Sequence, residues 1–168
     1  VRTFDCQANK VTTIAAGIPA VDPIAQDKSG RIFIGQSLSL KNTGLYELDP
    51  TGQNSPRLIL NKPGLNAFDF GSDGLLYSPL QFTGEIIKIN VDTGAIARVA
   101  SGLTSPTAVK FNSKGELFAL DAATGEVVKV DVATGQTKAI AQLQPGLDNL
   151  TFSPTDLLYA SNFVDSDI

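Results

Sequence analysis

The sequence predicts an all-β protein made of repeated units of four short antiparallel strands. Three observations lead to this prediction. Similar segments recur with a period of 41 to 44 residues, and β-rich runs alternate with turns rich in Gly, Asn, Asp and Pro. In addition, no stretch of the chain sustains the 3.6-residue hydrophobic period of a helix.

The repeat is visible in four segments, DKSGRIF, GSDGLLY, NSKGELF and SPTDLLY. The aromatic residues that close them are separated by steps of 44, 41 and 41 residues and are Phe33, Tyr77, Phe118 and Tyr159. The polar residues that end the β-rich runs form a second series with the same steps. They are Asp5, Asp49, Asn90 and Asp131. Because two features give one period, we expect one structural unit to be repeated along the chain.

Within each unit the local signals are those of strands joined by hairpin turns. GEIIKINVDTGAI, from Gly84, and GEVVKVDVATGQT, from Gly125, are the same hairpin in two successive units. In their D-x-x-T-G type turns the Asx side chain caps the turn and Gly supplies a positive φ. Four such strands in 41 to 44 residues are typical of a β-propeller blade.

Counting strands predicts a partial propeller with about four blades' worth of strands. Residues 1–16 supply the outer two strands of a blade, and residues 142–168 supply the inner two strands of another. The full blades between them are expected at 17–60, 61–100 and 101–141.

Propellers close into rings, which protects their sheet edges, so we expect this segment to belong to a larger ring of roughly six to eight blades. The expected partner is a second polypeptide that completes the ring. It is either the remainder of a cleaved precursor or a second copy of the chain. Since VRTFD at the start of the chain lacks an initiating Met, trimming of a longer chain is also expected.

Composition excludes several classes of function. The net charge of -4, with no Lys/Arg cluster, argues against nucleic acid or an anionic membrane as partner, and no apolar run approaches the roughly 20 residues of a membrane helix. The absence of His excludes a Ser-His-Asp triad, a Cys-His pair and a His-ligated zinc site built from this chain alone. The single cysteine, Cys6, cannot form an internal disulfide and is expected to be a strand residue.

The segment SPTAVKFNSKGELFALDAATGEVVKVDVATGQ resembles the superfamily of SMP-30/gluconolactonase-like, NHL and YncE-type propellers, and the resemblance covers the whole chain. At this level the chain is also similar to virginiamycin B lyase-like propellers. It lacks the Trp-Asp and Gly-His marks of WD40 blades. Because such relatives are often exported, the resemblance favours a secreted or periplasmic protein while leaving the compartment open.

Oxygen-bearing side chains recur where the chain leads into the first strand of each unit. These loops should meet around the channel mouth, and they carry Asp22, Asn66, Thr107, Asp148 and Asn149. The loops after the second strands add Asp121, Asn162, Asp165 and Asp167. Two interpretations stay open, because Asx side chains cap turns and because convergent carboxylates and carboxamides can hold Ca²⁺ without histidine.

The gluconolactonase-like branch holds one divalent cation on the channel axis with Asp, Asn and Glu side chains. This resemblance implies Ca²⁺ or another divalent cation bound by Asn66, Asp148, Asn149 and Asp22, with Thr107, Asp121 and Asn162 toward the substrate. It assigns no catalytic residue. A Glu ligand is not evident, because Glu47, Glu85, Glu116 and Glu126 are expected at exposed strand positions.

The resulting prediction is a small-molecule site at the channel mouth, with metal-assisted hydrolysis of a lactone or ester. One alternative is a non-catalytic propeller that binds a ligand or a protein. Another is a lactone-opening lyase whose His base lies outside this chain. Ser and Thr of LTSPT are expected to be turn residues, and the tyrosines Tyr46, Tyr77 and Tyr159 are expected to pack between blades.

Overall fold

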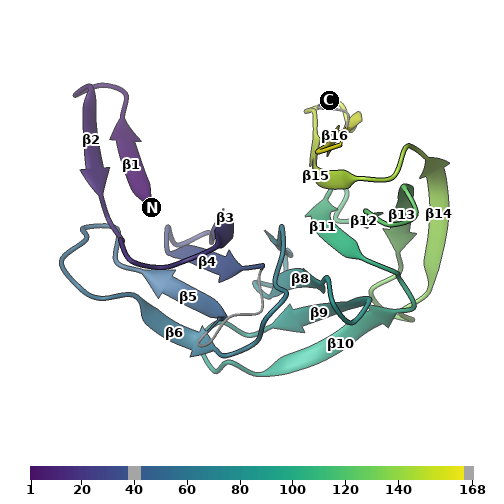
Figure 1. Ribbon diagram of the computed structural model, residues 1–168, viewed down its shortest axis with the longest axis horizontal. Coiled ribbons are helices and arrows are strands. Elements are labelled where there is room, and N and C mark those ends of the chain that lie inside the picture. The colour runs from purple at the N-terminus through teal and green to yellow at the C-terminus, as the bar shows by residue number, and fades with distance from the viewer. Residues whose placement is uncertain (38–42, 165–168) are drawn as a thin grey trace.

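The computed structural model describes residues 1–37 and 43–164, and these residues form sixteen β-strands and no helix (Figure 1). No helix able to span a membrane occurs within these two ranges. The strands are β1 (Arg2–Asp5), β2 (Lys10–Thr13), β3 (Val21–Gln26), β4 (Ile32–Gln36), β5 (Leu45–Leu48), β6 (Arg57–Leu60), β7 (Asp69–Phe70), β8 (Leu76–Leu80), β9 (Glu85–Ile89), β10 (Ile96–Ser101), β11 (Pro106–Phe111), β12 (Leu117–Asp121), β13 (Glu126–Val130), β14 (Thr137–Gln142), β15 (Leu147–Phe152) and β16 (Leu158–Asn162).

The strands form three complete antiparallel sheets and two half-sheets. The complete sheets have the orders β3-β4-β5-β6, β7-β8-β9-β10 and β11-β12-β13-β14, while β1-β2 and β15-β16 form two-stranded sheets. Figure 1 shows the sheets following one another around an open arc, with β1-β2 and β15-β16 on either side of the opening. The chain is therefore a partial β-propeller, as the repeat predicts.

The outer hairpins share one turn geometry, which explains their shared sequence. Asp131 Oδ1 accepts the N–H groups of the residues two and three positions further on, at 2.9 and 3.1 Å, and Gly135 follows with φ +75°. In the β1-β2 turn Asp5 Oδ1 makes the same two contacts at 2.9 Å, and Asn9 takes the left-handed position with φ +48°. Since Asn tolerates this conformation, β1-β2 is an outer hairpin despite its divergent sequence.

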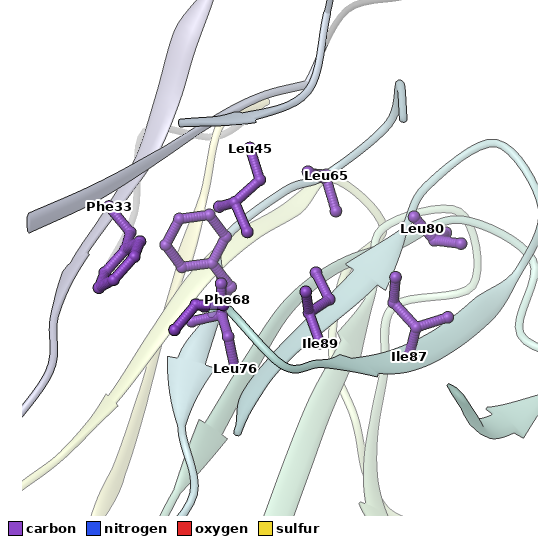
Figure 2. Close-up of a cluster of buried hydrophobic side chains, with 9 residues drawn as sticks. Phe33, Leu45, Leu65, Phe68, Leu76, Leu80, Ile87 and Ile89 are labelled. Carbon is purple, nitrogen blue, oxygen red and sulfur yellow. The ribbon is translucent and has the colours of Figure 1, made fainter. Parts of the chain in front are cut away.

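The hydrophobic core lies between successive sheets. Figure 2 shows the cluster between the first two complete sheets, where Phe33 and Leu45 meet Phe68, Leu76 and Ile89. Most of these side chains are fully buried, and burying each large apolar side chain contributes about 2 kcal/mol. The stability of each sheet therefore depends on its neighbours.

Aromatic pairs connect the second strand of one sheet to the first strand of the next. Phe33 packs on Phe70, Tyr77 on Phe111 and Phe118 on Phe152, with ring centroids 5.4, 5.0 and 5.1 Å apart in edge-on geometry. The packing expected of Tyr77 is confirmed, since it is only 4% exposed. Tyr159 lies in the last sheet of the described chain and is 48% exposed there, so its packing between blades stays a prediction.

Ion pairs also join neighbouring sheets. Arg31 contacts Asp27 within its own sheet, at 2.7 Å, and Asp92 in the next sheet, at 2.6 Å. Partial burial raises the pKa of Asp27, but hydrogen bonds from Ser29 and Arg31 outweigh this effect and lower the pKa to about 2. Both carboxylates raise the pKa of Arg31 further above its ordinary value.

Two other expectations are corrected by the structure. Cys6 is an exposed residue of the β1-β2 turn, because Asp5 ends the strand by capping that turn. The four glutamates are half-buried rather than exposed, and three of them form ion pairs across the sheet, namely Glu47 with Arg57, Glu85 with Arg98 and Glu116 with Lys129.

Candidate functional site at the channel mouth

The innermost strands are irregular where the predicted site residues lie. The pairing of β3 with β4 shifts between Val21 and Ile24, and that of β15 with β16 shifts between Leu147 and Leu150. A similar shift lies in β11, between Pro106 and Ala108. These irregularities contain Asp22, Thr107, Asp148 and Asn149, and bulges of this kind turn side chains away from a regular ladder.

A pocket of about 150 Å³ lies where the inner strands converge. Asp22 from β3 and Asn149 from β15 line it, together with Lys110 from β11. Its apolar lining includes Phe68 and Val109. The fold thus brings two of the predicted metal ligands, one from each end of the arc, into one pocket.

Asp148 lies next to this pocket, and its charge interacts with that of Asp22. Partial loss of hydration raises the pKa of Asp148, and the negative charge of Asp22 raises it further. Two carboxylates that repel each other are a favourable arrangement for a bound cation, because a cation removes the repulsion.

Asn66 and Asn149 use their amide oxygens in the same way. Each Oδ1 accepts the N–H of the following residue, Ala67 or Leu150, at 2.8 Å. Asn66 is 7% exposed, its Nδ2 donates to Gln81 Oε1 at 3.2 Å, and it does not line the pocket shared by Asp22 and Asn149. The structure therefore gives Asn66 a local hydrogen-bonding role, and metal binding by this residue stays a prediction.

Thr107 is buried and connects two sheets. Its Oγ1 donates to the carbonyl oxygen of Leu147 at 2.9 Å, and its exposed fraction is 3%. A substrate contact by Thr107 also stays a prediction.

A buried polar residue at the end of the second strand holds the loop that leads into the same sheet. Asp121 is 1% exposed, and its carboxylate accepts four N–H groups, those of Thr104, Ser105, Ala123 and Thr124. At the matching position Asn162 donates to the carbonyl oxygens of Gln144 and Pro145.

Gln36 takes this position in the first complete sheet, where it donates to Pro19 and accepts from Gly44. A substrate contact by Asp121 or Asn162 would have to share side-chain atoms already used in this loop network. Asp165 and Asp167, also expected at the mouth, lie outside the described residues.

The oxygen-bearing side chains at the channel mouth suit a hard cation, but the residues that the structure describes supply few of them. Within residues 1–37 and 43–164 there is no group of three or more His, Cys, Asp or Glu side chains that could hold a metal ion. Ca²⁺ takes six to eight oxygen ligands. Asp22, Asp148 and Asn149 together supply at most five side-chain oxygen atoms, so waters or further residues would have to complete the coordination shell.

Lys110 is a pocket residue that the sequence reasoning missed. Its Nζ lies 3.1 Å from Oδ1 of Asp69, which occupies the equivalent position in the preceding sheet. The repeat could have indicated this ion pair, since Asp69 and Lys110 occupy equivalent positions 41 residues apart and carry opposite charges. Gln81, the partner of Asn66, carried no comparable signal.

No protein-family model and no curated protein sequence matches the chain. A gluconolactonase from Xanthomonas campestris is similar in structure, with a TM-score of 0.77 at 16% identity over 96% of this chain. An auxiliary nutrient binding protein from Bacteroides thetaiotaomicron gives a TM-score of 0.76 at 13% identity over 96% of this chain.

A catalytically inactive virginiamycin B lyase from Staphylococcus aureus gives a TM-score of 0.60 at 13% identity over 85% of this chain. The chain spans 61% of the length of the gluconolactonase, 47% of the nutrient binding protein and 49% of the lyase. Identities this low establish the fold and not the activity. The resemblance seen in the sequence is thus confirmed at the level of architecture, and the chain has the propeller fold of the gluconolactonase-like and virginiamycin B lyase proteins.

Proposed function

We propose that this propeller binds a small molecule and a divalent cation at the channel mouth and hydrolyses a lactone or an ester. The observation that carries the proposal is the convergence of Asp22 and Asn149 in one pocket, with Asp148 close enough to Asp22 for their charges to interact. The similarity in fold to a gluconolactonase supports the choice of substrate class.

Each side chain has a distinct part in this proposal. A divalent cation bound there would polarise the lactone carbonyl and activate water. The carboxylates of Asp22 and Asp148 bind the cation, and Asn149 adds an amide oxygen. Lys110, held by Asp69, places a positive charge on the pocket wall, where it attracts the carboxylate product. No general base is assigned to the chain.

Metal binding is the first test. Ca²⁺ is titrated into the purified chain by calorimetry, alongside the variants Asp22→Asn and Asp148→Asn. Each variant should weaken binding at least about tenfold, or about 1.4 kcal/mol, because a neutral amide replaces a charged oxygen ligand. Asp131→Asn is the matched control and should bind like the parent, because Asn90 already occupies the equivalent turn position. Equal binding by all four proteins would contradict the proposed site.

Activity is tested separately, with glucono-δ-lactone as probe and acid release as readout. Hydrolysis that requires Ca²⁺ and is lost in Asp148→Asn supports the hydrolase. Binding of Ca²⁺ without turnover would confine the proposal to the metal site.

A non-catalytic binding propeller is the second candidate, because the nutrient binding protein is as similar in structure as the gluconolactonase. Such a protein has no requirement for a cation, so ligand binding that is unaffected by chelation favours it. A lactone-opening lyase would need a base from outside this chain, since the chain has no histidine. Its product would be an alkene rather than a hydroxy acid.

A further inference from the structure

Asp69 and Lys110 form an ion pair between the innermost strands of two complete sheets, β7 and β11. Lys110 Nζ lies 3.1 Å from Asp69 Oδ1, while Asp69 Oδ2 accepts the N–H of Phe111 at 3.0 Å. Both oxygens of Asp69 are therefore used, and one of them is tied to the backbone of β11. A carboxylate fixed in this way also fixes the position of the ammonium group that it binds.

The repeat shows that the fold does not require this ion pair. The equivalent positions are occupied by Ala25 in the first complete sheet and by Thr151 in β15, and neither residue can form an ion pair. The aromatic contacts between sheets, by contrast, recur along the arc. Departures from a local rule are expected where a protein has a functional site, so the pair is a candidate for recognition of a ligand.

Lys110 keeps the capacity to bind a second group. An ammonium group has three N–H donors, and the bond to Asp69 uses one of them. The side chain of Lys110 is 37% exposed, and it lines the pocket at the channel mouth. Within residues 1–37 and 43–164 its ion pair is with Asp69 and not with Asp22, which lines the same pocket. Two N–H groups of Lys110 can therefore be offered to a ligand.

The pocket combines two kinds of polar group over an apolar wall. Asp22 and Asn149 bring oxygen atoms, Lys110 brings the ammonium group, and Phe68 and Val109 are apolar. Its volume of about 150 Å³ lies below the roughly 300 to 1,000 Å³ usual for small-molecule pockets, so it suits a compact ligand. A neutral lactone offers the ammonium group only a neutral acceptor, whereas a carboxylate forms a charge-assisted hydrogen bond, which is about twice as strong.

We propose that the ligand of the channel mouth carries a carboxylate of its own, which binds the ammonium group of Lys110. The substrate class is then a lactone that bears a carboxylate away from the ring carbonyl, rather than a neutral lactone. The carbonyl end lies toward Asp22 and Asn149, and the carboxylate end lies toward Lys110. This inference rests on the proposed function, in which a small molecule and a cation bind at the mouth, and it adds the charge of that molecule.

The test compares two probes, the δ-lactams of gluconic acid and of glucaric acid. The ring nitrogen makes both resistant to hydrolysis, and the glucaric lactam has a carboxylate where the gluconic lactam has a neutral CH₂OH group. Binding to the intact chain is measured by calorimetry with Ca²⁺ in excess. The parent should bind the glucaric lactam about five- to tenfold more tightly, because Lys110 is partly exposed and its attraction is screened by water.

Three variants identify the group responsible for the preference. Lys110→Gln should bring the ratio of the two affinities to about one, and Lys110→Arg should retain the preference, because Arg keeps the charge and can pair with Asp69. Lys129→Gln is the matched control. It removes a positive charge that pairs with Glu116 outside the pocket, so its ratio should equal that of the parent. Because each ratio compares two ligands on one protein, a loss of stability alone does not change it.

Other outcomes overturn the inference. They are a ratio near one in the parent, no binding of the glucaric lactam, or a preference that survives Lys110→Gln, which would assign the carboxylate to the cation instead. Failure of the proposed hydrolysis is seen separately. A preference that depends on Lys110, without turnover of glucono-δ-lactone, supports the inference and contradicts the hydrolase. Turnover of that lactone without any preference between the lactams supports the hydrolase and overturns the inference.

Discussion

The ring of Tyr77 on β8 packs edge-on against the ring of Phe111 on β11, with centroids 5.0 Å apart and planes at 87°. This contact joins two sheets, and its counterparts recur along the arc as Phe33–Phe70 and Phe118–Phe152. Aromatic pairs in this geometry contribute beyond their buried area. The recurrence identifies these contacts as the repeated joint between blades.

Phe111→Ala should therefore lower the free energy of unfolding by about 2 to 4 kcal/mol, because it removes a ring from the joint and leaves a cavity. Urea unfolding measures this. Tyr159→Ala is the matched control, and its effect should stay within about 0.5 kcal/mol, since Tyr159 is 48% exposed. Equal losses in the two variants would contradict the role given to the joint.

Gly84 begins the repeated GEIIKI segment because there is no space for a side chain. Its φ is +69°, and a Cβ would lie 2.0 Å from the carbonyl oxygen of Leu103. Gly84→Ala should therefore abolish folding or cost more than about 3 kcal/mol. Gly74 also has a positive φ, +78°, but open space around it, so Gly74→Ala should cost only about 1 to 2 kcal/mol. Thermal unfolding measures the loss of stability in both variants. The difference between them gives the cost of the steric clash over that of backbone strain alone.

Asp27 makes stability depend on pH. Its pKa in the folded chain is about 2, below the ordinary 3.8, so the ionised form favours folding. The stabilisation is present above pH 3.8 and is lost as the pH falls toward 2. Asp27→Asn should be less stable than the parent at pH 7, and the difference should shrink as the pH falls below 4. Unfolding curves that stay equally separated down to pH 2 would contradict this prediction.

The interaction between Asp22 and Asp148 can be measured directly. Asp22→Asn removes the negative charge that raises the pKa of Asp148, so this pKa should fall toward its ordinary value. NMR titration of the labelled carboxyl carbon of Asp148 detects the shift. Asp92→Asn, a charge change on the β9-β10 turn, should leave this pKa unchanged. An unaltered pKa in Asp22→Asn would mean that the two inner strands do not bring these carboxylates together.

The order of the strands and their grouping into blades followed from the sequence, because these properties repeat. The residue that caps each outer turn and the aromatic residue on each second strand recur every 41 to 44 residues, so local rules applied to one unit applied to all. Even the divergent β1-β2 hairpin was recognisable, since Asp5 caps its turn as Asp131 caps the turn of β13-β14.

The candidate site was only partly predictable. The sequence placed Asn66, Asp148, Asn149 and Asp22 at the mouth by their position in the repeat. The structure brings Asp22 and Asn149 into one pocket, which Asn66 does not line, and the charge of Asp148 interacts with that of Asp22. The sequence did not separate these site residues from Thr107 and Asp121, which occupy similar positions in the repeat. Both of these side chains are buried and hydrogen-bonded to backbone groups. An Asx or Thr side chain before a strand has the same local sequence whether it caps a loop or faces a ligand.

The sequence by itself thus determined the repeat, the strands and the turns, which depend on contacts between residues close together in the chain. Only the tertiary structure decided that Asp22 and Asn149 line one pocket, because they lie at opposite ends of the arc and are brought to the same pocket by its curvature. It also decided that Lys110 shares their pocket. These properties come from the packing of one sheet against the next, which no single repeat contains.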